Sequence, residues 1–125
     1  MHKNTISVAT LLSTALLIGG CAGQSETRFA ADVKPVLDKH CAACHTQNGE
    51  GIQASGFDVG SYESVMKGTK FGPVVVGGDP LSSSLYRLVS GKVDASIKMP
   101  HGEESLSDAE IAVIESWIEQ GARNN

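Results

Sequence analysis

Three chemistry-bearing residues lie together at Cys41, Cys44 and His45, in the run Cys-Ala-Ala-Cys-His. Two cysteines three positions apart on a helical turn point to one side, so their thiols can add to the two vinyl groups of one porphyrin. The adjacent histidine can then reach the iron through a ring nitrogen. The sequence therefore predicts one covalently bound haem c, attached through Cys41 and Cys44 and ligated by His45 on the proximal side.

Two other chemistries compete for this run. A thioredoxin-like redox pair follows a strand in a βαβ unit, and nothing before Cys41 resembles a strand. A structural zinc site needs four ligands, usually two cysteine pairs or one pair with two spaced histidines. No second cysteine pair exists, and His40 is too close to Cys41 for the usual finger spacing. Covalent haem is therefore favoured, and a zinc-bound module remains the alternative.

The N-terminal residues have the features of an export signal. A short basic start precedes an apolar stretch over 6–18 that is too short to span a bilayer. Ile18-Gly19-Gly20-Cys21 resembles a bacterial lipobox, and an unpaired exposed thiol would be a liability in an oxidising compartment. We expect residues 1–20 to be a lipoprotein signal peptide, Cys21 to be lipidated, and residues 21–27 to form a short flexible tether. The alternative is a conventional signal that leaves Cys21 as a free thiol.

Charge restricts the partners. The formal net charge of the 125 residues is −4, and the chain has no basic run, so we expect no nucleic-acid partner. Removing residues 1–20 leaves nine basic against 14 acidic residues, or −5, which could favour a basic redox partner or simply aid solubility. The export signal places the protein on the periplasmic side of a bacterial membrane. Because Ala22 rather than an aspartate follows Cys21, resemblance to lipoprotein sorting rules favours the outer membrane of a Gram-negative host.

Helical patterns frame the haem motif. An apolar face at three-to-four spacing predicts a helix over 29–45, with Thr27 as its N-cap and Pro35 either kinking it or lying in a first turn that begins near Asp32. A capping box of Ser107 and Glu110 begins a C-terminal helix that Gly121 ends. We expect this helix to pack against the first one, with Trp117 as a packing residue near the haem rather than a chemical participant.

Shorter elements lie between these helices. The sequence predicts a helix over 61–67, capped by Ser61 and stopped by Gly68, and another over 81–90 that follows Asp79-Pro80. The glycine-bounded stretch 71–78 reads equally as a brief strand or as a buried loop along the haem.

A second axial ligand must come from another part of the chain. The candidates are Met66, Met99, His101 and His40. We favour Met99, because it precedes Pro100 in a loop segment whose polar surroundings are poorly suited to burying a methionine as a core residue. His101 is its rival, and Met66 reads as a core residue. Arg87, Tyr62 and Tyr86 could each hydrogen-bond a haem propionate or be ordinary surface residues.

These residues together resemble the class I cytochrome c fold, and more closely the planctomycete-type cytochrome c domains of exported bacterial proteins. The resemblance covers about residues 28–123 and rests on these segments: Val33-x-Pro35-x-Leu37, Cys41-x-x-Cys44-His45, Gly72-Pro73, Gly77-x-Asp79-Pro80, Ser84-Leu85, Met99-Pro100, Leu106-Ser107 and Trp117-Ile118-x-x-Gly121-Ala122.

The resemblance implies an all-α cytochrome c domain with crossed N- and C-terminal helices, and short helices and loops around one haem. It also implies thioether links at Cys41 and Cys44, proximal His45 and distal Met99. One departure is that no Gly-Pro follows His45 closely, so the residue that orients its imidazole is not identified.

The predicted function is single-electron transfer between redox partner proteins by an exported, membrane-tethered mono-haem cytochrome. The chain has no catalytic constellation, so we expect neither enzyme activity nor a small-molecule substrate. The alternative is a haem enzyme or sensor with a labile sixth ligand, which would reduce peroxide or bind a gas.

Overall fold

The computed structural model describes residues 25–125. The expected signal peptide, Cys21 and the first part of the expected tether lie outside these residues. The described part is helical, with no strand and a single isolated bridge between Thr69 and Gly72, which confirms the all-α prediction. Its elements are η1 (Phe29–Val33), α1 (Lys34–His40), α2 (Ala42–His45), α3 (Glu50–Ser55), α4 (Tyr62–Lys67), α5 (Ser84–Val89), η2 (Ala95–Ile97) and α6 (Asp108–Glu119).

The expected helix over 29–45 is divided into three parts. Its first turn, η1, is π-helical, and the N–H of Lys34 donates to the carbonyl of Phe29 five residues back. This wider turn places Pro35 in the first turn of α1, where its missing N–H costs no hydrogen bond. Cys41 then leaves helical geometry at φ −123° and separates α1 from α2. The expected Thr27 cap is wrong, because Arg28 holds that position without a side-chain bond.

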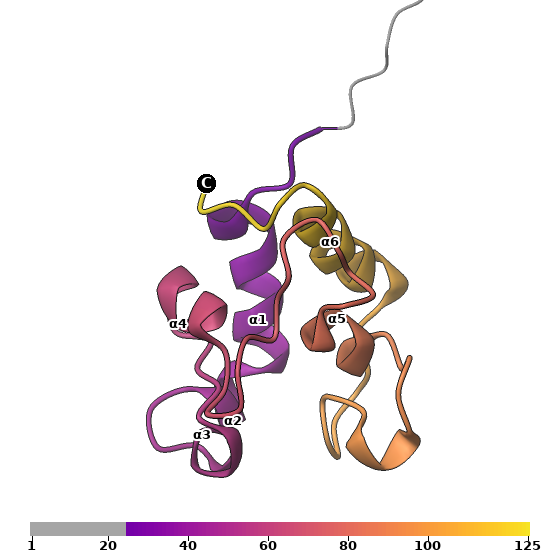
Figure 1. The fold of residues 1–125 in the computed structure, drawn as a ribbon. Helices are drawn as coiled ribbons and strands as arrows, with labels where there is room; N and C mark the ends of the chain where they lie inside the picture. Colours follow the sequence, from indigo (N-terminus) through magenta and orange to yellow (C-terminus); the bar gives the residue numbers. More distant parts are fainter. Residues whose placement is uncertain (1–24) are drawn as a thin grey trace, which may run out of the picture.

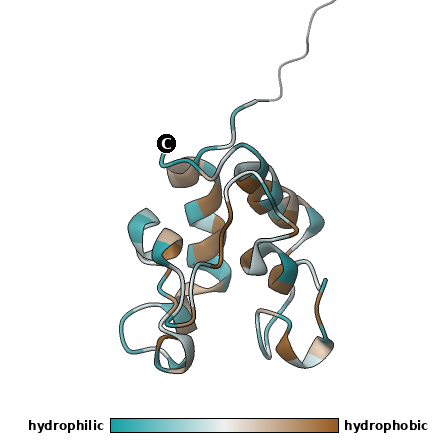
Figure 2. Cartoon of the chain, viewed as in Figure 1, coloured by the Kyte–Doolittle hydropathy of each residue, from teal (hydrophilic) through white to brown (hydrophobic). Residues whose placement is uncertain are grey.

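The C-terminal helix α6 matches its sequence pattern closely. Ser107 and Glu110 form the reciprocal capping box, and the chain leaves the helix through Gly121 at φ +97°, a conformation that favours glycine. The helix packs against η1 and α5. Trp117 is 1% exposed and lies in an aromatic cluster, with ring centroids 5.4 Å from Phe29 and 6.4 Å from Tyr62. Figure 2 shows the apolar stretches of α1 and α6 within this helical core.

The middle of the chain follows the sequence predictions in part. Helix α4 has the expected Ser61 cap and ends at Gly68. Helix α5 begins only at Ser84, three residues later than expected, because the Asp79 carboxylate accepts bonds from the backbone and hydroxyl of Ser82 and holds a separate turn. The segment 71–78 is a loop rather than a strand. Val74 and Val75 in this loop are buried, whereas Phe71 is 82% exposed.

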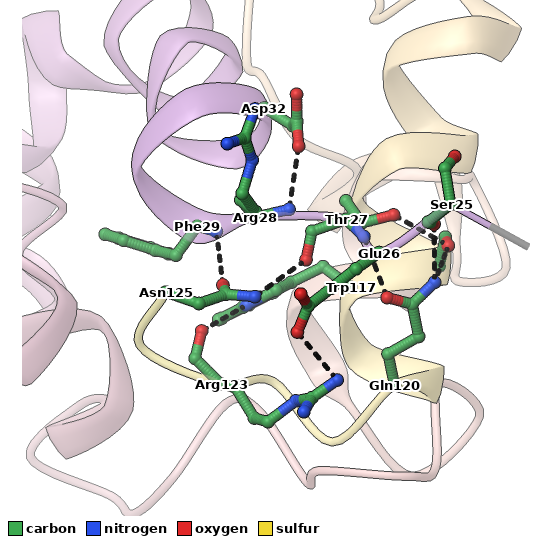
Figure 3. Close-up of polar contacts among 11 residues, drawn as sticks. Ser25, Glu26, Thr27, Arg28, Phe29, Asp32, Trp117, Gln120, Arg123 and Asn125 are labelled. Atoms are coloured by element: carbon green, nitrogen blue, oxygen red, sulfur yellow. Dashed lines mark hydrogen bonds and ion pairs between the residues drawn. The ribbon is translucent and has the colours of Figure 1, made fainter.

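The two ends of the described chain are fastened to each other, and we call this group of contacts between residues 25–32 and 116–125 the clasp (Figure 3). The N–H of Thr27 donates to Gln120 Oε1 at 2.8 Å, and the N–H of Phe29 donates to Asn125 Oδ1 at 2.9 Å. Arg123 forms an ion pair with Glu26 at 2.9 Å. The clasp lies at the upper end of the molecule in Figure 1, above η1 and the C-terminal end of α6.

None of the helices within residues 25–125 has both the length and the apolar content needed to cross a membrane.

Candidate functional site: a cavity lined by the cysteine–histidine motif

A cavity of about 450 Å³ opens between α2 and α3 on one side and α5 with the 99–103 segment on the other. Its floor is apolar and is formed by the buried side chains of Phe57, Val74, Leu85 and Val89. Its exposed lining residues belong to α2, α3 and the 101–103 segment, which therefore form its rim. The lining includes Cys41, Cys44, His45 and Met99, so the structure brings the two predicted attachment cysteines and the two predicted axial ligands to one cavity. Size and apolar lining are typical of a cofactor site.

Both cysteines of the motif are free thiols on the cavity wall, with Cys41 partly buried and Cys44 exposed. Burial, with smaller contributions from the nearby carboxylates of Glu103 and Asp38, raises the pKa of the Cys41 thiol to about 11. Two unpaired thiols facing one cavity are what thioether attachment of a porphyrin requires.

His45 is oriented by a backbone carbonyl that the sequence did not identify. Its Nδ1 lies 3.0 Å from the carbonyl oxygen of Phe57. A carbonyl can only accept, so Nδ1 must carry the proton and donate it. Nε2 is then left with a free lone pair, which is the form of histidine that binds a metal. The sequence has no Gly-Pro soon after His45 whose carbonyl could orient the imidazole. The Phe57 carbonyl orients it instead.

Gly51 lies directly against the imidazole ring of His45. A Cβ at this position would lie 2.5 to 2.7 Å from three atoms of the His45 ring, which is too close for any side chain. Gly51 belongs to α3, a helix that the sequence analysis did not predict because its apolar periodicity is weak. The cluster of glycines at 49, 51 and 56 is the signal that could have shown a tightly packed segment here.

Met99 and His101 both line the side of the cavity opposite α2, which carries Cys44 and His45. Both candidates for the sixth iron ligand therefore lie at the cavity. Met99 is half-buried, packs against the core, and its N–H donates to the carbonyl of Leu88 at 3.1 Å. His101 is exposed on the rim. Met66 packs against the core and is not among the lining residues, in agreement with its expected packing role.

His40 also borders the cavity, but its ring is already engaged. Its Nε2 lies 3.0 Å from Glu110 Oε1, and Lys39 Nζ donates to the same oxygen at 2.8 Å. The other oxygen of Glu110 accepts from Ser107 in the α6 cap. Lys39, followed by the Ser107 N–H and His40, holds the pKa of Glu110 well below its usual range. Glu110 therefore joins the end of α1, next to the motif, to the start of α6.

The residues suggested for propionate binding lie elsewhere. The Tyr62 hydroxyl donates to the carbonyl of Ala122 at 2.8 Å. Tyr86 is buried, and the carboxylate of Glu115 together with burial raises its pKa to about 12. Neither these tyrosines nor Arg87 lines the cavity, and Trp117 is likewise a core residue away from it.

The donor set and the shape of the cavity fit a covalently held haem. Two free thiols, a histidine with an unoccupied Nε2 and a thioether surround an apolar floor. A zinc site is not assembled, because within residues 25–125 no three or more histidine, cysteine or acidic side chains are arranged so that together they could hold a metal ion. The site therefore suits iron–porphyrin chemistry better than it suits either alternative.

Comparison with known proteins agrees with this geometry. Residues 41–103, which are half of the chain, match the family model described as planctomycete cytochrome C. The match begins at Cys41 and includes Met99, whereas η1, α1 and α6 lie outside it, so it is narrower than the expected span of 28–123. No curated protein and no solved structure matched the chain. Cytochrome c domains act outside the cytoplasm and carry electrons through haem, and on the combined evidence of the motif, the cavity and the match, this chain belongs to the planctomycete cytochrome c family.

Proposed function

We propose that the protein is a lipid-anchored, mono-haem c-type cytochrome that passes single electrons between redox partner proteins. One observation carries the proposal: His45, with Nδ1 committed to the Phe57 carbonyl, shares an apolar cavity with Cys41, Cys44 and Met99. When bound there, haem supplies an iron that cycles between two oxidation states.

Each of the site residues has a separate role in this proposal. Cys41 and Cys44 hold the porphyrin through thioether bonds, so it cannot be lost outside the cytoplasm. The Phe57 carbonyl and Gly51 keep the imidazole of His45 in one orientation and leave Nε2 available to ligate an iron. Met99 would supply a second protein ligand, and a thioether ligand raises the reduction potential relative to a second histidine. The buried floor excludes water, which leaves an electron to pass through the exposed rim.

The N-terminal part of the proposal rests on sequence alone. It comprises a signal peptide over residues 1–20, lipidation at Cys21, a tether over 21–27 and a cytochrome c domain over 28–123. Residues 25–27 of this tether are held by the clasp, so only its first part is free of such contacts to the folded body in the proposal. The mass of the N-terminal peptide of the mature protein tests it. An acylated Cys21 at the new N-terminus is expected, and an unmodified thiol, or a start elsewhere, would contradict the anchor.

A redox titration of the purified protein tests the electron-transfer function. The expected result is covalent haem on a denaturing gel, one reversible one-electron transition, and no rapid binding of carbon monoxide by the ferrous form. Rapid binding of carbon monoxide would mean that the sixth position is open, and would favour the haem enzyme or sensor instead. Absence of covalent haem would contradict both and return the zinc-bound module to consideration.

A further inference from the structure

The clasp and the cavity occupy opposite ends of the molecule. The cavity lining begins at His40 and ends at Glu103, so none of it comes from the residues that form the clasp. From Phe29, which the clasp holds, η1 and α1 run 12 residues to the motif, and at helical rise they span about 18 Å. In Figure 1 the rim elements α2 and α3 lie at the lower end, whereas both ends of the described chain lie at the upper end.

The clasp also fixes the point at which the N-terminal segment leaves the folded body. Ser25, Glu26 and Thr27 are each held to the C-terminal residues: Gln120 Nε2 donates to the Ser25 carbonyl at 3.4 Å, Glu26 pairs with Arg123, and Thr27 bonds to Gln120 and to Ser116. Several contacts act together, so the chain cannot swing freely at this point without breaking them (Figure 3).

Very little chain remains between the clasp and Cys21. Only residues 22–24 intervene before Ser25, and four peptide steps reach at most about 14 Å in any conformation. This reach is shorter than the length of η1 and α1. A lipid on Cys21 therefore keeps the clasp end near the bilayer and leaves too little chain for the molecule to invert and set its cavity end face-on against the lipid.

We propose that the anchored protein is held with its clasp end against the membrane and its cavity opening toward the aqueous compartment, so that the haem exchanges electrons with water-soluble proteins or domains rather than with a partner embedded in the same bilayer. This orientation rests on the proposed lipidation of Cys21 and on the haem site, and it adds the direction of approach and the class of partner.

The distance from haem to lipid tests the orientation. The lipidated holoprotein is reconstituted in phosphatidylcholine vesicles that contain a headgroup fluorophore, whose emission the haem quenches by energy transfer at short range. The native protein should quench weakly. A matched variant with a flexible Gly/Ser insertion of about 20 residues between Gln24 and Ser25 should quench more strongly, because its cavity end can reach the lipid. Quenching by the native protein that equals or exceeds that of the variant would overturn the orientation.

A second measurement addresses the partner class. The rate constant for reduction by a small water-soluble donor is compared between the protein in detergent and the same protein in vesicles. We expect agreement within about twofold, since the rim stays exposed, and a tenfold fall in vesicles would overturn the proposal. Mass analysis of the N-terminal peptide separates the two ways of failing: no acyl group on Cys21 refutes the anchor and the orientation together, whereas an acylated protein that quenches strongly refutes the orientation alone.

Discussion

The clasp and the cavity differ in whether their polar groups have partners within the protein. At the clasp, backbone N–H groups of the first helical turn find protein acceptors, and the aromatic cluster of Trp117, Phe29 and Tyr62 fills the space beneath them. At the cavity, apolar walls face an opening, and two thiols and a lone imidazole nitrogen have no protein partner. Protein atoms alone satisfy the polar groups of the first region, whereas the second offers an apolar cavity that suits a large apolar ligand. Substitutions in the two regions should therefore affect different properties.

The largest effect is expected from removing both attachment points. In Cys41→Ala/Cys44→Ala, haem has no thioether link, so covalent haem staining on a denaturing gel should be lost almost completely. The matched control is Cys21→Ala, which removes a cysteine outside the motif and should keep its stain. Equal staining of the double variant and the native protein would show that this motif does not attach haem.

A single methyl group at Gly51 should be the next most damaging change. In Gly51→Ala the new Cβ overlaps the His45 ring, so the imidazole must turn away from the Phe57 carbonyl. Overpacking of this kind costs about 1–3 kcal/mol of unfolding free energy, and the yield of holoprotein should fall with it. Denaturant titration of the holoprotein and its Soret spectrum measure the two effects.

Gly60→Ala is the matched control for that change. Its Cβ would meet only the side chain of Asp58, whose Oδ1 lies at 3.0 Å and accepts from the Gly60 N–H, so a shift of a few tenths of an ångström is enough. The two alanine variants should differ clearly in stability and in spectrum. If they behave alike, the contact between Gly51 and His45 has no importance for the site.

A clasp substitution should lower stability and leave the haem spectrum unchanged. Gln120→Ala removes the acceptor of the Thr27 N–H and the bond to Ser116, which together contribute about 1–2 kcal/mol to the unfolding free energy. Denaturant unfolding should show this loss, and the Soret band should stay in place. Gln53→Ala, which loses only a local bond to the Asn48 carbonyl, serves as control. A shifted Soret band in Gln120→Ala would mean that the two regions are not separable.

Glu110 joins the end of α1, next to the motif, to the start of α6, and its contribution to stability should depend on pH. Its folded-state pKa is held below the ordinary value of 4.5, so its stabilising contribution is fully present above that value and declines as pH falls below it. Glu110→Gln should therefore unfold at lower denaturant than the native protein at pH 7, and the gap should narrow below about pH 4. Glu104→Gln removes an exposed negative charge from the loop before α6 and controls for the loss of one charge. A gap that stays constant with pH would refute the coupling.

The same comparison shows what the sequence could and could not predict. The capping box of Ser107 and Glu110, the stop at Gly121 and the cap at Ser61 depend on residues within one turn, and all three are present in the structure. The motif and Met99 were found from residue type, because few side chains bind iron. The structure places them around one cavity, where their roles stay proposals.

The missed features depend on contacts between distant segments. Any residue type supplies a backbone carbonyl, so no letter of the sequence marks the Phe57 oxygen as the partner of His45. Asn125 reaches the first helical turn 96 positions away, and the capping role expected for Thr27 is lost because its side chain contacts Ser116 instead. The early start predicted for α5 failed because Asp79 caps a tight turn with Ser82 rather than a helix. Local pattern describes the elements, and their packing determines which backbone groups meet.

The central claim is that the cavity holds haem iron between His45 and Met99, and the visible spectrum of the ferric protein tests it most directly. The weak far-red band of a methionine–iron bond should be present in the native protein, persist in His101→Ala and disappear in Met99→Ala, together with a fall in reduction potential. A native spectrum without that band, or a band that survives in Met99→Ala, would contradict the account.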